Sequence, residues 1–318
     1  MSDMVEGVVE PMLPTLSRGG DAGLKSKGLW RDAMRQTLRK PSALIGVVLL
    51  LLLVLMALLA PVLAPYGPRQ DFLSEGVLRR SEPCWHVLGC DDSVQEHILG
   101  TDGNGRDYLS RLMYGARISM LSGVGSVSLA VAIGAALGLV AGFYGRWIDS
   151  LIMRCMDVLL AFPSLLLAIT IVTVLGKGLF NAVIAISIVT IPIYARVVRA
   201  SVLTVREQEF VTADRALGVS SRRILLHRVL PNSMTPLVVQ ATLGIATAVL
   251  EIAALSFLGL GVQPPGAEWG SMLAAERQQL ITSPHLVIAP GVLIMLNVLA
   301  FNLVGDGLRD ALDPRLNK

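Results

Sequence analysis

Six long apolar stretches constrain the fold of this chain more than any other feature. Crossing the ~30 Å hydrocarbon layer of a membrane takes about 20 helical residues, because a helix satisfies its own backbone hydrogen bonds. The stretches are residues 42–63, 120–143, 151–174, 179–198, 235–259 and 285–304. A soluble helix carries a polar face, which residues 43–63 lack. We therefore predict an all-α, polytopic membrane protein with about six transmembrane helices.

Composition and charge support this class and orient the chain. Hydrophobic residues make up 53% of the sequence and charged residues 16%, against roughly 25% charged in a soluble domain. Sixteen Lys and Arg fall in 1–41, 144–150, 201–234 and 305–318, and eight fall in 64–119, 175–178 and 260–284. Positive residues concentrate on the cytoplasmic side, so both termini are expected to be cytoplasmic. The net charge of +3 reflects this topology and does not indicate nucleic-acid binding.

The segments outside the spans carry their own expectations. Residues 1–41 are expected to form a cytoplasmic leader, in which 28–40 make a basic amphipathic helix at the membrane interface. Residues 64–119 are expected to form an extracytoplasmic loop that ends in a helix along the outer surface. The other predicted parts are the first span at 42–63, a core of five spans at 120–308 with a cytoplasmic loop at 201–234, and a cytoplasmic tail at 309–318.

Two cysteines, Cys84 and Cys90, fall within the predicted extracytoplasmic loop. Disulfides form and persist outside the cytoplasm, so the compartment favours a bridge between them, with two reduced thiols as the alternative. A calcium site in the same loop is not supported, because Asp102 and Asn104 are not followed by the bidentate acid that such a loop needs.

Glycines and prolines indicate how the spans pack. Gly134, Gly138 and Gly142 recur every four residues in the second span, a spacing that lets a neighbouring helix approach closely. Pro163 and Pro192 interrupt the third and fourth spans, where a proline bends a helix and frees a carbonyl group.

Charged residues within the spans need partners, because a bare charge in the membrane is costly. Glu251 lies near the middle of the fifth span. It lines a translocation path, or it pairs with a neighbouring helix or a second subunit, and the sequence leaves both possibilities open. Arg154 and Asp157, three residues apart near the start of the third span, are expected to pair with each other.

The sequence contains no catalytic motif and no metal-ligand cluster. Its only Gly-Lys pair, Gly176-Lys177, is followed by Gly178, so the phosphate-binding loop Gly-x4-Gly-Lys-Ser/Thr is absent. The four histidines are scattered along the chain. Any step driven by ATP therefore requires another chain, and an enzymatic role for this one is not expected.

A polar segment, residues 209–231, separates the fourth and fifth spans on the predicted cytoplasmic side. A short helix there can present an apolar surface made by Glu209, Phe210, Ala213, Leu217 and Val219. The following Gly218 tolerates the backbone angles that bend or reverse a chain. A solvated loop would not need apolar residues in this register, so we expect the segment to dock a soluble partner.

This segment resembles the loop by which permeases of ABC importers dock onto their ATPase subunits. That loop carries Glu-Ala-Ala, three further residues, a glycine and a later Leu-Pro. The corresponding residues here are Thr212, Ala213 and Asp214, then Gly218, then Leu230 and Pro231. Thr212 stands where the family has an acid, and Asp214 where it has the second alanine.

From Trp30 onward the chain resembles the C-type membrane subunit of dipeptide and oligopeptide ABC importers. The resemblance rests on LGTDGNGRDYLSRLMYGARIS, IMRCMDVLLAFPSLLLAI, QATLGIATAVLEIAALSFLGLGVQPPGAEWG and GDGLRDALDPR. It implies a type I importer-permease fold in the bacterial inner membrane and half of a translocation path for peptides. The implied partners are a homologous second permease, two ATPase subunits that bind ATP and magnesium, and an extracytoplasmic solute-binding protein.

Two alternatives remain at this stage. Importers of nickel, glutathione and other small solutes share this type of permease, although the spans lack a histidine or cysteine cluster suited to nickel. A secondary transporter would also have kinked, glycine-rich helices. It would more often show inverted repeats, and it would have no use for a docking segment.

Overall fold

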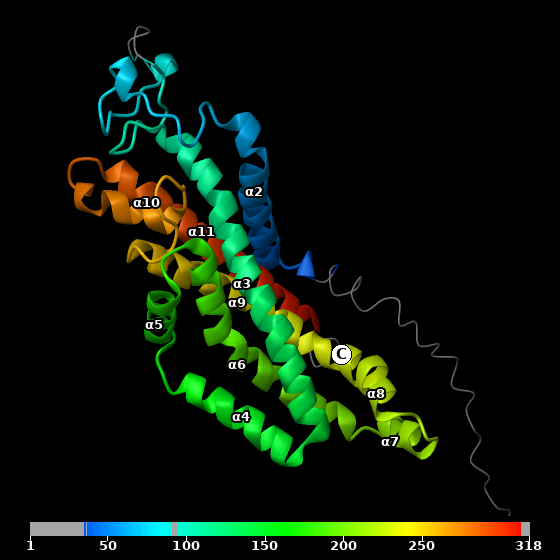
Figure 1. Cartoon of the computed structure of the whole chain (residues 1–318). Helices are drawn as coiled ribbons and strands as arrows, with labels where there is room; N and C mark the ends of the chain where they lie inside the picture. The colour runs from blue at the N-terminus through cyan, green and yellow to red at the C-terminus, as the bar shows by residue number, and fades with distance from the viewer. Residues whose placement is uncertain (1–34, 36, 89, 91–94, 313–318) are drawn as a thin grey trace, which may run out of the picture.

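The structure is a computed structural model that describes residues 35, 37–88, 90 and 95–312. Within these residues the chain is helical, with isolated bridges between loop residues and no strand. The helices are α2 (Pro41–Leu63), α3 (Tyr108–Tyr144), α4 (Arg146–Leu160), α5 (Ser164–Leu175), α6 (Leu179–Arg206), α7 (Glu209–Ala216), α8 (Ser221–Ile224), α9 (Leu230–Phe257), α10 (Trp269–Glu276) and α11 (Pro284–Leu312). They form an elongated bundle (Figure 1). The interfacial helix predicted at 28–40 and the end of the predicted tail lie largely outside the described residues.

Five helical segments are long and apolar enough to cross a membrane, and a bent pair brings the number to six. The five are α2, α3, α6, α11 and the continuous segment Ser221–Phe257, which includes α9. The predicted all-α membrane fold with about six spans is therefore confirmed. The helix boundaries differ from the prediction, most notably at α3, which begins at Tyr108 and continues for 37 residues, so no separate surface helix precedes the second span.

The two prolines predicted to interrupt spans behave differently. α4 ends at Leu160, α5 begins at Ser164, and the two helices meet at 91°. Pro163 accounts for this break, because proline donates no backbone hydrogen bond and disfavours helical angles at Phe162 before it. At Pro192, by contrast, α6 continues as one helix through the buried residue.

Ion pairs to α6 hold α4 beside it. Arg199 Nη2 donates to Asp149 Oδ2 at 2.6 Å, and Arg196 Nη2 donates to Asp157 Oδ1 at 2.6 Å. The predicted pair between Arg154 and Asp157 is wrong, because the Asp157 carboxylate reaches across to α6. Spacing along one helix could not show this partner, which lies on another element.

Helices α3 and α6 approach most closely at the three glycines of α3. A methyl group added there would lie 2.8 Å from Ile191 O at Gly134, 2.3 Å from Ala195 O at Gly138 and 2.8 Å from Val202 Cγ1 at Gly142. Contacts this short leave no room for a side chain, and two of the three are with backbone atoms that cannot move aside. The glycines therefore let the two backbones pack directly against each other.

The loop 64–107, here called the outer loop, lies at the end of the molecule opposite to α7 and α8 (Figure 1). A disulfide joins Cys84 and Cys90, whose Cα atoms are 5.4 Å apart. His97 Nδ1 and Asp107 Oδ1, both buried, lie 2.9 Å apart and tie the loop to the start of α3. Asp107 also caps α3, because its carboxylate accepts a hydrogen bond from the Ser110 amide at 2.8 Å.

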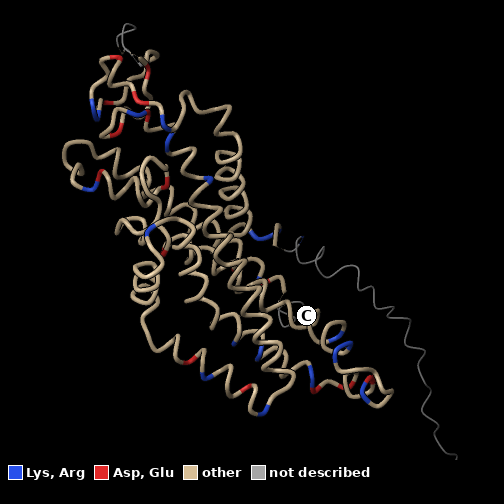
Figure 2. The backbone as a smooth tube through the Cα atoms, in the orientation of Figure 1, with Lys and Arg blue, Asp and Glu red and all other residues tan. Residues whose placement is uncertain are grey.

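The start of α2 and the end of α11 lie side by side. Lys40 Nζ and Asp310 Oδ2 form an ion pair at 2.7 Å that joins them. Charged residues gather at the outer loop, along α4 and around α7 and α8, and are sparse along the middle of the bundle (Figure 2). This distribution matches a bundle whose central section faces hydrocarbon.

Candidate functional site

The polar segment 209–231 folds into a compact helix–turn–helix at one end of the bundle (Figure 1). Its turn is made by Gly218, whose φ is +77°, a left-handed angle that glycine adopts without strain. The turn is closed by hydrogen bonds from the Gly218 amide to Arg215 O and from the Val219 amide to Asp214 O, both 3.0 Å long. Such bonds satisfy carbonyl groups that the end of α7 leaves free. The turn therefore has one defined geometry.

Contacts with α3 and with the core hold the end of α6 and this helix–turn–helix in place. Arg206, at the end of α6, donates from Nη1 to the Gly142 carbonyl at 2.7 Å. The Arg215 guanidinium lies 5.9 Å from the centre of the Phe143 ring, within range of a cation–π interaction. Val211 of α7 is fully buried in the core. The segment is thus attached to the bundle on one side.

The opposite side of the segment exposes apolar groups. Leu217 is 81% exposed and Phe210 38%, beside the exposed Thr212 and Ala213. These side chains are available for the contact with a soluble partner that the sequence led us to expect. Val219, which the sequence grouped with this surface, packs instead against the core.

The remaining predicted residues of the segment lie beside this surface. Asp214 Oδ2 accepts a hydrogen bond from Arg228 Nε at 2.9 Å, an ion pair across the turn. Glu209 begins α7, where a negative charge is favourable at a helix N-terminus. Leu230 and Pro231 are the first residues of α9, so the segment continues directly into a long helix. A displacement of the segment would therefore move α9.

Glu251 lies far from this segment, on α9 against the start of α5. Its Oε1 accepts a hydrogen bond from Ser164 Oγ at 3.0 Å. Its Oε2 is buried and has no hydrogen-bond partner within the described part of the chain. Ser164 is the first residue after the 91° bend, a contact that sequence reasoning missed because nothing in the local pattern links the two positions.

Glu251→Gln is expected to lower transport by about tenfold, the scale set by the loss of one charge-assisted contact. Glutamine keeps the shape of the side chain, so the amount of assembled protein should be unchanged. Uptake and assembly are measured together, with Ser164→Ala as the matched variant that removes only the observed partner. Full uptake and full assembly in Glu251→Gln would show that the charge of Glu251 has no role in transport or assembly.

A bundle of helices long and apolar enough to span a membrane, with a compact helix–turn–helix at one end, is the arrangement that the sequence led us to expect of a transport permease. The chain belongs to the family of binding-protein-dependent transport system inner membrane components, whose model matches residues 134–318. A second model, the N-terminal transmembrane domain of oligopeptide transport permease C, matches residues 28–78. The predicted membership of an ABC-importer permease family, and with it the inner-membrane location, is confirmed.

Individual relatives cover nearly the whole chain. It is 47% identical to the dipeptide transport system permease protein DppC of Alkalihalophilus pseudofirmus over 90% of each chain. It is 50% identical to a di/tripeptide permease of Pseudomonas aeruginosa, covering 86% of this chain and 88% of that one. A glutathione transport permease of Escherichia coli is 43% identical over 90% of this chain and 91% of its own.

The fold is also found among solved structures. A chain of the MetNI methionine ABC transporter, in an inward-facing conformation, superposes with a TM-score of 0.52 and 19% sequence identity. The match covers 63% of this chain and 96% of that one. The chain therefore has the fold of a type I ABC-importer permease.

Proposed function

We propose that this chain is one of two permease subunits of an ATP-driven importer of di- and oligopeptides. The observation that carries the proposal is the α7–Gly218–α8 element, which exposes Leu217 and Phe210 and continues into α9. An ATPase subunit docked on this element would move α9, which continues from it, and would act on the end of α3 through the contact of Arg215 with the Phe143 ring. The names of the relatives support a peptide substrate, because two of them are permeases for dipeptides and for di- or tripeptides. A third is a glutathione permease, so glutathione is the alternative substrate.

The proposal assigns sides and partners. Residues 1–41, 201–234 and 309–318 are cytoplasmic, and 64–119 are extracytoplasmic. Two ATPase subunits bind ATP and magnesium, a homologous second permease completes the translocation path, and a solute-binding protein delivers the peptide. This chain binds no cofactor of its own. Closure of the ATPases on ATP opens the path outward, and hydrolysis resets it.

Uptake of labelled Ala-Ala and of labelled glutathione, in cells with and without this gene, tests the substrate. Loss of Ala-Ala uptake in the deletion strain, restored by the gene, is the expected result. Unchanged Ala-Ala uptake with loss of glutathione uptake would replace the substrate and leave the permease role in place.

Leu217→Glu is expected to abolish capture of the ATPase subunits, because a charge then has to enter an apolar contact. Leu217 is largely exposed and does not hold the fold together, so the variant permease should still insert into the membrane and stay folded in detergent. The measurement is co-purification of the ATPases with the detergent-solubilised permease. Leu78→Glu is the matched control, since Leu78 is 76% exposed at the opposite end. Equal ATPase capture by both variants would contradict docking at Leu217.

A further inference from the structure

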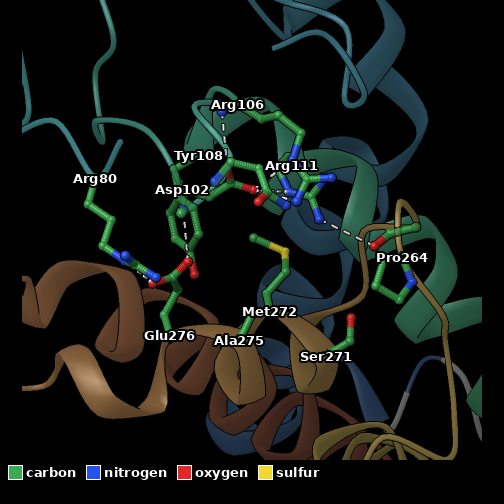
Figure 3. Close-up of a pocket in the computed structure, with 13 residues that line it drawn as sticks. Arg80, Asp102, Arg106, Tyr108, Arg111, Pro264, Ser271, Met272, Ala275 and Glu276 are labelled. Carbon is green, nitrogen blue, oxygen red and sulfur yellow. Dashed lines mark hydrogen bonds and ion pairs between the residues drawn. The ribbon is translucent and has the colours of Figure 1, made fainter. Parts of the chain in front are cut away.

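Glu276 ends α10 and reaches into the outer loop (Figure 3). Its Oε2 accepts a hydrogen bond from Arg80 Nε at 2.7 Å, and its Oε1 accepts one from the Gly103 amide at 2.9 Å. Glu276 is only 3% exposed. A carboxylate at the C-terminus of a helix is opposed by the helix dipole. Its position therefore gains nothing for α10 itself and is explained by the two contacts across to the loop.

The part of the outer loop that Glu276 contacts is a stiff turn. Asp102 Oδ1 accepts hydrogen bonds from the amides of Asn104 at 2.8 Å and Arg106 at 3.0 Å. Its Oδ2 accepts a third from Arg106 Nε at 2.8 Å. Gly103 lies inside this turn, so a force on its amide acts on the whole turn.

Arg111 of α3 makes an indirect link, because it pairs with Asp102 at 3.2 Å and donates to Pro265 O and Gly266 O at 3.3 Å, just before α10. The direct hydrogen bond between α10 and this turn is the one that Glu276 accepts from the Gly103 amide. A cavity of about 190 Å³, lined mainly by polar and charged residues, lies between them, and Arg80, Asp102 and Glu276 border it (Figure 3). The cavity supplies no packing, so α10 itself meets the turn through the hydrogen bond of Glu276, beside the indirect link through Arg111.

α10 is in turn fixed to α9. A methyl group on Gly270 would lie 2.3 Å from Ala253 O, so the two helices pack backbone to backbone. Trp269, fully buried, also ties α10 to α3 through a 3.0 Å hydrogen bond from its indole Nε1 to Leu112 O. Packed helices thus connect the α7–Gly218–α8 element, here called the docking element, through α9 to Glu276 in α10.

We propose that Glu276 is a positioning residue that fastens the outer loop to α10, so that movement of α9 at the docking element repositions the surface met by the binding protein. The inference rests on the proposed function. It predicts that the contact transmits the signal of a loaded binding protein to the ATPases, and that basal ATP hydrolysis does not depend on it.

The test uses the complete transporter in lipid nanodiscs, with its binding protein and Ala-Ala as the probe. Glu276→Gln and Arg80→Gln should each lower the ATPase rate stimulated by the loaded binding protein by about fivefold, as one charge-assisted hydrogen bond is lost. The basal rate should stay unchanged. The stimulated ATPase rate of the double variant should be no lower than that of the more impaired single variant, because both substitutions act on the same Arg80–Glu276 ion pair. Arg79→Gln, an exposed neighbour, is the control.

Each outcome decides the inference. Full stimulation in Glu276→Gln, or additive losses in the double variant, would overturn it. An equal fall of basal and stimulated rates would assign Glu276 a merely structural role and overturn it as well. A wild-type transporter that Ala-Ala and the binding protein do not stimulate would instead refute the proposed function.

Discussion

Gly218→Val will leave the chain inserted and folded but will lower transport by about tenfold or more. The residue has a φ of +77°, and no described atom lies within 4 Å of the position that a Cβ would take. The valine side chain therefore fits, and only the backbone angle is opposed, at a cost of about 1–3 kcal/mol for a non-glycine residue in a sparsely populated region. The turn would relax and misplace Leu217 relative to the ATPase. Uptake and ATPase rates of the purified complex measure the uncoupling.

Gly218→Asn is the matched control, because asparagine tolerates the left-handed region while it also adds a side chain. Transport close to wild type in Gly218→Asn, together with loss in Gly218→Val, would assign the effect to the backbone angle. Normal transport in Gly218→Val would remove the coupling role of this turn. Equal loss in both variants would show that any side chain at the position blocks docking.

Gly138→Val is expected to prevent the formation of a folded bundle. A Cβ at this position would lie 2.3 Å from Ala195 O, a backbone atom that can move only if α6 moves. Overpacking of a core costs about 1–3 kcal/mol where side chains can yield, so a clash with the backbone is expected to exceed that range. The yield of monodisperse protein after detergent extraction and its thermal midpoint measure the loss.

Gly125→Val in the same helix is the control for Gly138→Val. No described atom lies within 4 Å of a Cβ at Gly125, and its φ is an ordinary helical one. Wild-type yield for Gly125→Val and a collapsed yield for Gly138→Val would place the close approach of α3 and α6 at Gly138. Wild-type yield for both would show that the helices are further apart than described.

Local composition was enough to predict the spans, since apolar length alone decides whether a segment can cross a membrane. Contacts between distant segments were not predictable. Asp157 could be assigned to Arg154 by spacing, yet its partner Arg196 lies on another helix. Glu276 and Arg80 are 196 residues apart, and the sequence around neither residue indicates that they form a contact.

The two prolines also show that local sequence does not decide where a helix ends. Pro163 ends a helix and Pro192 does not, although both occur within apolar spans. Proline weakens a helix locally, and the surrounding packing decides whether the helix continues. The turn within residues 209–231 was predictable because its left-handed angle favours a glycine. The attachment of Arg206 and Arg215 to the end of α3 was not, because it depends on the folded bundle.

The bend between α4 and α5 has a consequence for the thickness of the barrier. α5 has twelve residues, which rise about 18 Å along the helix axis, well short of the ~30 Å hydrocarbon layer. Its end turns into α6 through Gly176 and Gly178, where Asn181 Nδ2 donates to the carbonyls of Leu175 and Gly176. With α4 at 91° to it, α5 does not gain the missing length from the helix before it. Neighbouring helices must therefore cover the part of the hydrocarbon layer that α5 does not reach.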